Sequence, residues 1–154
     1  MTPVVMVDTR EQRNHVTDYL NRNGIPNVRS KMYVGDYTRL DNQTICVDRK
    51  QNLQEICGNI CQQHTRFKSE MERAKAAGIR LIFLVEHVGA IKTLDDVCNW
   101  QNPRLKTSPY ALNGVGLYRR MLTIQEKYGV QWQFCDKRST GKRVCELLGV
   151  TSIA

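Results

Sequence analysis

The stretch IRLIFLVEH, residues 79–87, limits the folds open to this chain more strongly than any other segment. Five apolar residues follow one another at positions 81–85, a run that has the length of a strand and is too short for an ordinary helix. Because apolar and polar residues do not alternate, the strand is expected to be covered on both faces. Such a strand is typical of the sheet of an α/β protein, where helices pack on both sides.

The rest of the chain predicts the other strands and helices of such a fold. The predicted strands are residues 3–8, 28–40, 43–50, 79–87 and 130–136, and the predicted helices are residues 11–24, 52–78, 117–129 and 139–149. A turn at residues 41–43 joins two of the strands, and the long helix has break signals near Gly58 and His64. Since a hairpin is followed by crossover connections, this order predicts an α/β fold with a mixed sheet.

With 154 residues the chain is long enough for one domain with its own core. Residues 88–115 have the least regular pattern, because Pro103, Pro109 and two glycines interrupt it. We expect an insertion or loop region there, with a short helix near residues 93–99. The sequence shows no internal repeat and no low-complexity tract, so we predict a single domain over residues 1–154.

Two aspartates stand in the segments that are predicted to form the hairpin. Asp36 follows an apolar run in MYVGDY, and Asp48 ends another run in TICVDRK. Lys50 shares the face of Asp48, because residues two apart on a strand point the same way. If the turn has three residues, Asp36 lies opposite Asp48 with about 5 Å between their Cβ atoms. A two-residue turn would shift the register and could place the two side chains on different faces.

Two ionised carboxylates at that distance repel each other by about 3 kcal/mol at an effective dielectric constant of about 20. A shared proton, an ion pair or a divalent cation has to compensate for this repulsion. One reading is structural, with the aspartates paired to Arg49, Lys50 or another arginine. The other is a metal site, because Asp8 and Glu11 end the first strand at the edge of the same sheet. Carboxylates that converge with a lysine suit Mg²⁺ and the hydrolysis of a phosphodiester.

Three short motifs carry a resemblance to a known family. They are VDTRE with Asp8, Arg10 and Glu11, then VGDY with Gly35 and Asp36, and then VDRK with Asp48, Arg49 and Lys50. In this order and on these elements they resemble the nuclease domain of the XPF/Hef group, which belongs to the PD-(D/E)XK, restriction-endonuclease-like superfamily. The resemblance covers most of residues 4–149 outside residues 88–115.

The resemblance implies a restriction-endonuclease-like mixed central sheet flanked by helices. It also implies a metal-dependent endonuclease that cuts flap, fork, junction or single-stranded DNA in repair or recombination. The implied ligands of Mg²⁺ or Mn²⁺ are Asp36, Asp48, Asp8 and the carbonyl group of Arg49. The implied catalytic residues are Asp36, Asp48, Lys50, Asp8, Glu11 and Arg10. Lys50 would position the attacking water, and Arg10 and Arg66 would stabilise charge on the phosphate.

Two positions depart from the family's pattern. Asp48 replaces the family's glutamate with a carboxylate that is one methylene shorter, and Gln54 stands where the family has a later acid, next to Glu55. The group also includes nuclease-like domains that have lost their acids and act as scaffolds, so an inactive DNA-binding module is the alternative. The acids and the lysine that this chain retains favour the enzyme.

The net charge of +8, from 23 basic and 15 acidic residues, favours a polyanionic partner and nucleic acid first. The basic side chains that could contact DNA are Arg66, Arg104, Lys106, Arg119, Arg120, Lys142 and Arg143. A solvated helix face would explain the later members of this set equally well. Trp100 and Tyr110 are candidates for stacking on unpaired bases. No base-reading motif is present, so recognition of DNA structure or backbone is expected.

Six cysteines without a CxxC pair predict free thiols in a reducing compartment, and hence a cytoplasmic or nucleoid-associated protein. Cys57, Cys61 and His64 share one helical face and are a candidate zinc set, although no fourth ligand is apparent. The same face continues through apolar residues, which indicates a core stripe instead. No apolar run approaches the roughly 20 residues of a membrane span, and the N-terminus lacks the basic leader of a signal peptide.

Two expectations concern assembly. Because family nuclease domains commonly dimerise through their late helices, the resemblance implies a homodimer. The residues that could form its shared face, or equally the core, are Leu117, Met121, Ile124 and Leu147. Family members often carry a helix-hairpin-helix tandem or a helicase module, and neither is expected within these 154 residues.

Overall fold

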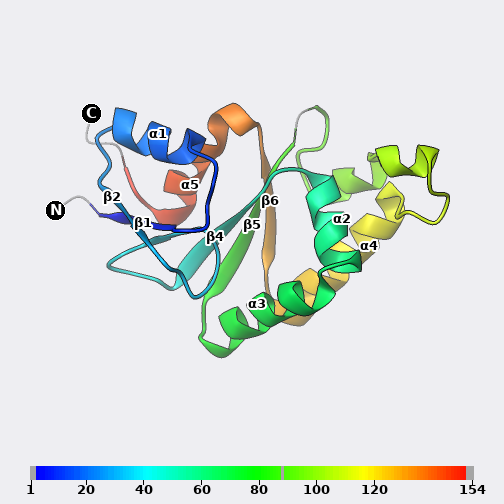
Figure 1. Ribbon diagram of the computed structural model, residues 1–154, viewed down its shortest axis with the longest axis horizontal. Helices are drawn as coiled ribbons and strands as arrows, with labels where there is room; N and C mark the ends of the chain where they lie inside the picture. Colours follow the sequence, from blue (N-terminus) through cyan, green and yellow to red (C-terminus); the bar gives the residue numbers. More distant parts are fainter. Residues whose placement is uncertain (1–2, 88, 152–154) are drawn as a thin grey trace.

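The computed structural model describes residues 3–87 and 89–151, and Figure 1 shows a sheet between two groups of helices. The sheet has six strands in the order β2-β1-β3-β4-β5-β6. They are β1 (Val5–Asp8), β2 (Asn27–Ser30), β3 (Tyr37–Arg39), β4 (Ile45–Lys50), β5 (Arg80–Glu86) and β6 (Gln131–Cys135). Strand β3 is antiparallel to both of its neighbours, whereas the other pairs are parallel. The predicted α/β fold with a mixed sheet is confirmed.

Strand β5 is the one that the apolar run predicts. It lies between β4 and β6, parallel to both, and every side chain from Leu81 to Glu86 is buried. The Phe83 ring packs on one face of the sheet, with 4.7 Å between its centroid and that of Trp132. Leu84 belongs to a separate core cluster. The strand is therefore covered on both faces, as the absence of alternation indicates.

The helices divide between the two faces of the sheet. One face carries α2 (Leu53–Cys61), α3 (His64–Ala76) and α4 (Gly114–Tyr128), and the other carries α1 (His15–Arg22) and α5 (Thr140–Leu148) (Figure 1). The helix predicted for residues 52–78 is thus broken just before His64, at one of its two break signals. Helix α4 begins earlier than predicted, because the Asn113 side chain caps it by accepting a hydrogen bond from the Gly116 amide.

The prediction of one strand over residues 28–40 is wrong. This part of the chain forms β2 and β3, which pair with opposite edges of β1. Residues 31–36 connect them, and Gly35 in this connection has a φ of 74°. A Cβ atom on Gly35 would lie 3.1 Å from the Val47 carbonyl oxygen. A left-handed glycine pressed against β4 interrupts the extended backbone, and a pattern of alternating residues does not reveal it.

Strands β3 and β4 have the register that a three-residue turn produces. Tyr37 pairs with Val47, so continuing the ladder by one step brings Asp36 opposite Asp48. The Asp36 amide donates a hydrogen bond to the Val47 carbonyl over 2.8 Å. The hairpin therefore delivers both carboxyl groups to the same end of the sheet.

Residues 89–115 fold onto α4, and Val88 lies outside the described residues. Two 3₁₀ helices, η1 (Asp95–Asn99) and η2 (Pro103–Lys106), organise the segment, and η1 matches the short helix expected near residues 93–99. The buried Asn102 side chain donates to the Leu112 carbonyl and accepts from the Arg104 amide. The insertion is consequently a packed unit with internal hydrogen bonds.

The late hydrophobic residues lie largely in the interior. Leu117 and Met121 are fully buried in the core, whereas Ile124 and Leu147 are partly buried at its margin. Core packing therefore accounts for Leu117 and Met121 without a second copy of the chain.

The zinc site that the sequence left as an alternative receives no support. Over residues 3–87 and 89–151, no three His, Cys, Asp or Glu side chains gather as a ready-made metal site, so Cys57, Cys61 and His64 show no zinc arrangement. All six cysteines are free. Within the same described residues, no helix has both the length and the apolar character that crossing a bilayer requires.

Candidate active site

Strand β4 carries the residues at the centre of the site. Asp48 and Lys50 lie on one face of the sheet and Arg49 on the other, as the alternation of a strand dictates. Asp48 and Lys50 are only 7% and 5% exposed, and 3.7 Å separates Lys50 Nζ from Asp48 Oδ1. The ammonium group also lies 5.2 Å from the centroid of the Phe67 ring. A carboxylate and an aromatic face thus stabilise a charge that is otherwise costly to bury.

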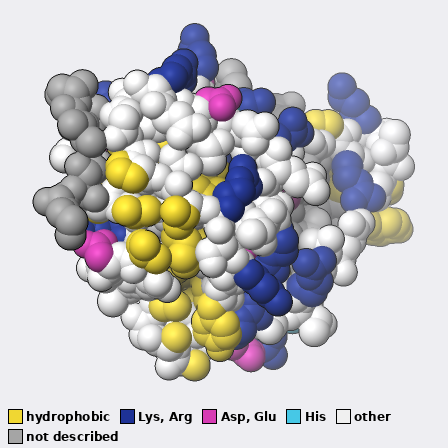
Figure 2. Space-filling view, turned by 60° about the vertical axis from the view of Figure 1, so that its left-hand side comes forward, with side chains coloured by type: hydrophobic (Ala, Val, Ile, Leu, Met, Phe, Trp, Pro, Cys, Tyr) yellow, Lys and Arg dark blue, Asp and Glu magenta, His cyan; other side chains and the backbone are white. Residues whose placement is uncertain are grey.

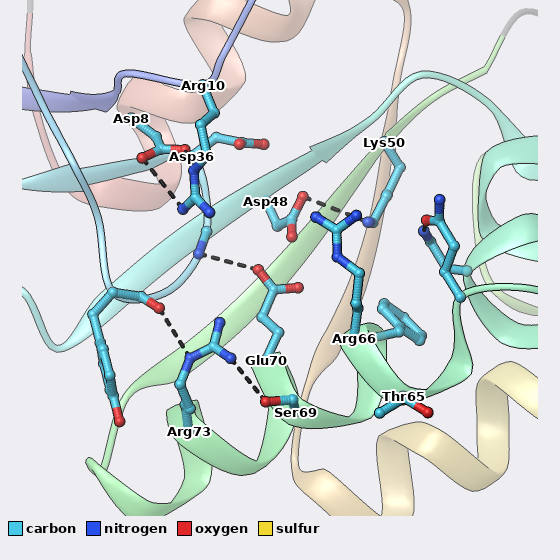
Figure 3. A pocket seen from close by; sticks show the side chains of 15 residues that line it. Asp8, Arg10, Asp36, Asp48, Lys50, Thr65, Arg66, Ser69, Glu70 and Arg73 are labelled. Atoms are coloured by element: carbon cyan, nitrogen blue, oxygen red, sulfur yellow. Dashed lines mark hydrogen bonds and ion pairs between the residues drawn. The ribbon is translucent and has the colours of Figure 1, made fainter.

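Both side chains line a cleft of about 520 Å³ between the sheet and α3 (Figure 3). The charged residues of its lining are Asp8, Asp36, Asp48, Glu70, Lys50, Arg10, Arg66 and Arg73. The structure therefore brings together six of the residues that the sequence predicts for the site, from three strands or strand ends and one helix. It adds Glu70 and Arg73, which the sequence motifs do not predict as site residues.

Asp8 is held at the end of β1 by two donors. The Met32 amide donates to Asp8 Oδ1 over 2.9 Å, and Arg10 Nε donates to Asp8 Oδ2 over 2.8 Å. Arg10 Nη2 also donates to the Met32 carbonyl over 3.2 Å. These bonds fix the first motif to the loop that follows β2, while the Arg10 side chain stays 62% exposed beside the cleft.

Asp36 is held by the backbone of β4, because the Arg49 amide donates to Asp36 Oδ2 over 2.8 Å. Burial and the charge of Asp48 raise the pKa of Asp36 well above its ordinary value, and Glu11 acts in the same direction. The charge of Asp48 therefore opposes the ionisation of Asp36, as the register of the hairpin leads one to expect. A proton or a cation between them would relieve this repulsion.

Glu70, on α3, faces the aspartates from the other wall of the cleft (Figure 3). Its Oε2 accepts a hydrogen bond from the Gly35 amide over 3.2 Å, and its carboxyl group is hydrogen-bonded to Asp48. Burial and the charge of Asp48 raise the pKa of Glu70 to about 9, so it holds a proton at neutral pH. The sequence signal for it was its place four residues after Arg66, which puts both on one helix face.

The chemistry of these donors fits a divalent cation. Asp36, Asp48 and Glu70 present buried carboxyl groups close together. Burial lowers the pKa of Lys50, but the charges of Asp48 and Glu70 outweigh this effect, so the pKa is raised. The single ammonium group of Lys50 can balance the charge of only one carboxylate. In the described part of the chain, no three His, Cys, Asp or Glu side chains are grouped so that they could hold a metal ion together. Mg²⁺ does not need such a group, since it typically binds one or two carboxylates and keeps several waters.

Replacing Glu70 by Gln is expected to flatten the pH dependence of stability in the metal-free protein. The folded-state pKa of Glu70, about 9, lies above its ordinary value of 4.5. Between these pH values the unfolded chain releases a proton that the folded chain keeps, so the free energy of unfolding falls as the pH rises. A neutral glutamine removes this slope of at most about 1.4 kcal/mol per pH unit. Urea unfolding in EDTA between about pH 6 and 9 measures it.

The exposed Glu72, on the same helix, supplies the matched control for this measurement. Glu72→Gln should leave the pH dependence as it is in the wild type. Equal slopes for Glu70→Gln and the wild type would contradict the assignment of a raised pKa to Glu70.

Glu11 and Arg49 lie behind β4, on the opposite face from the cleft. Arg49 donates to both carboxylate oxygens of Glu11, over 2.9 Å each, and its Nη1 donates to Glu86 Oε1 over 2.7 Å. The Tyr37 hydroxyl also donates to Glu11 Oε2. Burial opposes the ionisation of Glu11, but the hydrogen bonds from Arg49 and Tyr37 outweigh it and lower the pKa. Glu11 does not line the cleft and occupies a supporting position.

Glu55, the neighbour of the neutral Gln54, points toward Lys50. Gln54 is exposed, whereas Glu55 Oε2 lies 3.7 Å from Lys50 Nζ. The other oxygen of Glu55 accepts from the Gln51 amide, and the Glu55 amide donates to the Asn52 side chain. This reciprocal cap at the start of α2 orients the carboxylate toward Lys50.

The basic residues predicted to contact DNA do not share one location. Of the seven, only Arg66 lines the cleft. The others are Arg104 and Lys106 on η2, Arg119 and Arg120 on α4, and Lys142 and Arg143 on α5. Helix α5 packs on the far face of the sheet, where Arg143 donates to Glu146 and Gln133 over 2.9 Å each. Lys142 and Arg143 therefore lie apart from the candidate active site.

Comparison with known proteins agrees with the fold described above. A family model described as the ERCC4 domain matches residues 7–146. The structure of XPF from Aeropyrum pernix aligns with a TM-score of 0.65 and 22% identity over 96% of this chain and 60% of that one. XPF from Aeropyrum pernix in complex with DNA aligns with a TM-score of 0.66 and 23% identity over 96% of this chain and 64% of that one.

The match confirms the predicted fold. The chain spans less than two thirds of the length of either XPF chain. Among curated proteins none matches it.

Proposed function

This chain is a member of the ERCC4 domain family, and from that premise we propose that it is a metal-dependent DNA endonuclease that hydrolyses phosphodiester bonds. The observation that carries the proposal is the cleft in which Asp36, Asp48 and Lys50 lie together. Arg49, which a purely structural reading would pair with these acids, points away and binds Glu11 and Glu86. Two acids and a lysine that are left facing a cleft are the parts that metal-assisted hydrolysis uses.

Asp36 and Asp48 would hold Mg²⁺ or Mn²⁺, with the Arg49 carbonyl and Asp8 in support. When bound, the ion would supply Lewis-acid stabilisation of the charge that develops on the phosphate. The raised pKa of Asp36 in the metal-free chain supports this assignment, because a cation favours the ionised form that burial and Asp48 disfavour.

The basic residues of the cleft would handle the water and the phosphate. Lys50 Nζ, held 3.7 Å from Asp48 Oδ1, would orient the attacking water and keep positive charge next to it. Arg10 and Arg66 would donate hydrogen bonds to the non-bridging oxygens of the phosphate, for which a guanidinium group is well shaped. Their exposed side chains at the cleft support this role.

The proposed substrate is DNA with branched or single-stranded regions, in repair or recombination. DNA as the partner is supported by the net charge of +8 and by the likeness to an XPF structure in complex with DNA. Arg10, Arg66 and Arg73, which can donate to phosphate oxygens, line the cleft, and the sequence holds no base-reading motif, which favours recognition of DNA structure over sequence.

A cleavage assay tests the proposal. Labelled single-stranded, flap, fork, Holliday-junction and blunt duplex DNA would each be incubated with the protein in Mg²⁺ or Mn²⁺, and in EDTA. We expect cutting of one or more non-duplex substrates, at least about a thousandfold slower in EDTA and restored by excess metal.

Tight binding without cutting of any substrate, in either metal, would contradict the enzyme. That outcome would favour a nuclease-like DNA-binding scaffold, the alternative raised by the neutral Gln54.

A further inference from the structure

A second cavity of about 480 Å³ adjoins the cleft, and we call it the basic cup. Its lining consists of Arg10, Lys31, Met32, Tyr33 and Arg73. Arg10, Tyr33 and Arg73 line the cleft as well, so the two spaces share a wall. Four acids line the cleft beside its four basic side chains, whereas no acid lines the cup, so a nucleic-acid strand that leaves the cleft in this direction enters more basic surroundings.

The loop that forms the cup is anchored to two acids of the cleft. The Met32 amide donates to Asp8 Oδ1 over 2.9 Å, and the Gly35 amide donates to Glu70 Oε2 over 3.2 Å. Tyr33 lies between these two bonds. Any ligand that rests on Tyr33 therefore contacts a segment that is hydrogen-bonded to the candidate active site on both sides.

Tyr33 displays its ring to solvent on this anchored loop. The neighbouring Met32 and Val34 are buried, whereas Tyr33 is 62% exposed. Arg73 supports it, because the guanidinium carbon lies 5.5 Å from the ring centroid and Nε donates to the Tyr33 carbonyl over 3.2 Å. Across residues 3–87 and 89–151, no other aromatic ring stacks on Tyr33. Its ring is thus a supported surface with room for a planar partner.

The charge of the cup is only partly neutralised. Asp8 pairs with Arg10, but within the described ranges neither Lys31 nor Arg73 forms an ion pair. Figure 2 shows Lys and Arg side chains gathered on the face that is turned forward, next to exposed hydrophobic side chains. An aromatic surface flanked by unpaired cations is the combination that binds single-stranded nucleic acid, since the ring stacks on a base and the cations bind phosphates.

We propose that the basic cup is a subsite for an unpaired nucleotide that flanks the scissile phosphate of a DNA strand. Tyr33 stacks on the base, and Lys31 and Arg73 bind the adjoining phosphates. The base has to be unpaired, because its neighbours cover the faces of a base within a duplex. The inference deepens the proposed function and rests on it, since the cleft defines which phosphate is scissile.

Binding in EDTA tests the subsite independently of cleavage. Fluorescence anisotropy would compare a labelled single-stranded oligodeoxynucleotide with a blunt duplex, using the full chain. We expect Tyr33→Ala to weaken single-strand binding about tenfold and duplex binding less than about twofold, whereas Tyr33→Phe keeps both affinities. Lys31→Ala should reduce the slope of log affinity against log salt on the single strand by about 0.7.

Leu40→Ala is the control, because Leu40 is 49% exposed and lines neither the cleft nor the cup. Its affinities should equal those of the wild type, and thermal melts of all variants check that the fold is retained. Unchanged single-strand affinity of Tyr33→Ala, or an equal loss on duplex, would overturn the subsite.

Two further outcomes separate the proposals. Tighter Tyr33-dependent binding of single-stranded RNA of the same sequence would overturn the assignment to DNA. If the protein binds a single strand through Tyr33 but cuts no DNA, the endonuclease is refuted and nucleotide binding by the basic cup is supported. If the protein cuts DNA without any need for Tyr33, the endonuclease is supported and the subsite is refuted.

Discussion

The Asp48→Asn variant is expected to cleave DNA at least about a thousandfold more slowly than the wild type, because Lewis-acid stabilisation contributes several kcal/mol and about 1.4 kcal/mol changes a rate tenfold. Asparagine keeps the size of the side chain and removes the charge that holds the cation. Stability should change little, because the lost ion pair with Lys50 is offset by the loss of repulsion between Asp48 and Asp36. Single-turnover cleavage of the preferred substrate in Mg²⁺ measures the rate.

Lys50→Ala tests the partner of Asp48 in the same assay. A loss of about a hundredfold to ten-thousandfold is expected for a group that helps to transfer or orient a proton. Asp41→Asn is the control, because Asp41 is an exposed aspartate in the hairpin turn. If Asp48→Asn and Asp41→Asn cut equally fast, the metal site on β4 is refuted.

Arg49→Ala is expected to destabilise the fold by about 3–5 kcal/mol, the range for breaking a buried ion pair. The Arg49 side chain is 9% exposed, and its partners Glu11 and Glu86 are 5% and 3% exposed. The variant would leave two buried carboxylates without their cation, although Glu86 keeps its bond to His15. Urea unfolding at neutral pH measures the change.

The pH dependence of this loss gives a second check. Because the pKa of Glu11 is lowered in the folded wild type, its stabilisation is present above the ordinary value of 4.5 and disappears as the pH falls through the lowered value. The difference between Arg49→Ala and the wild type should therefore narrow in acid. Arg39→Ala, which breaks an exposed pair with Asp41, should change stability little at any pH. An equally small effect of Arg49→Ala would contradict the supporting role.

The sequence was sufficient for the strands and side chains whose positions follow from local periodicity. The apolar run of β5 predicts a strand covered on both faces, and the spacing of Asp48 and Lys50 predicts their shared face. The sequence left a two-residue and a three-residue turn open, and the structure has the register of the three-residue turn, which brings Asp36 opposite Asp48. These features depend on residues close together in the chain, so their geometry follows from the periods of strands and turns.

The features that the sequence did not reveal depend on contacts between distant segments. The separation of residues 28–40 into β2 and β3 results from the packing of Gly35 against β4. Glu70 joins the site because α3 lies across the sheet, 35 residues after the Gly35 amide that it binds. The exposure of the Tyr33 side chain likewise follows from the burial of its neighbours Met32 and Val34 and cannot be predicted from the local sequence.

The position of β4 has a consequence for the way in which this protein would lose activity. Strand β4 is hydrogen-bonded to β3 on one side and to β5 on the other, and β5 is itself buried on both faces. Backbone segments of this kind open to solvent only in the largest, rarest fluctuations, whereas edge strands and loops exchange their amide hydrogens through small ones. Asp48 and Lys50 thus lie in the part of the molecule that is most resistant to local unfolding. Heating would then inactivate the site in one cooperative step together with global unfolding, and not through gradual fraying around it.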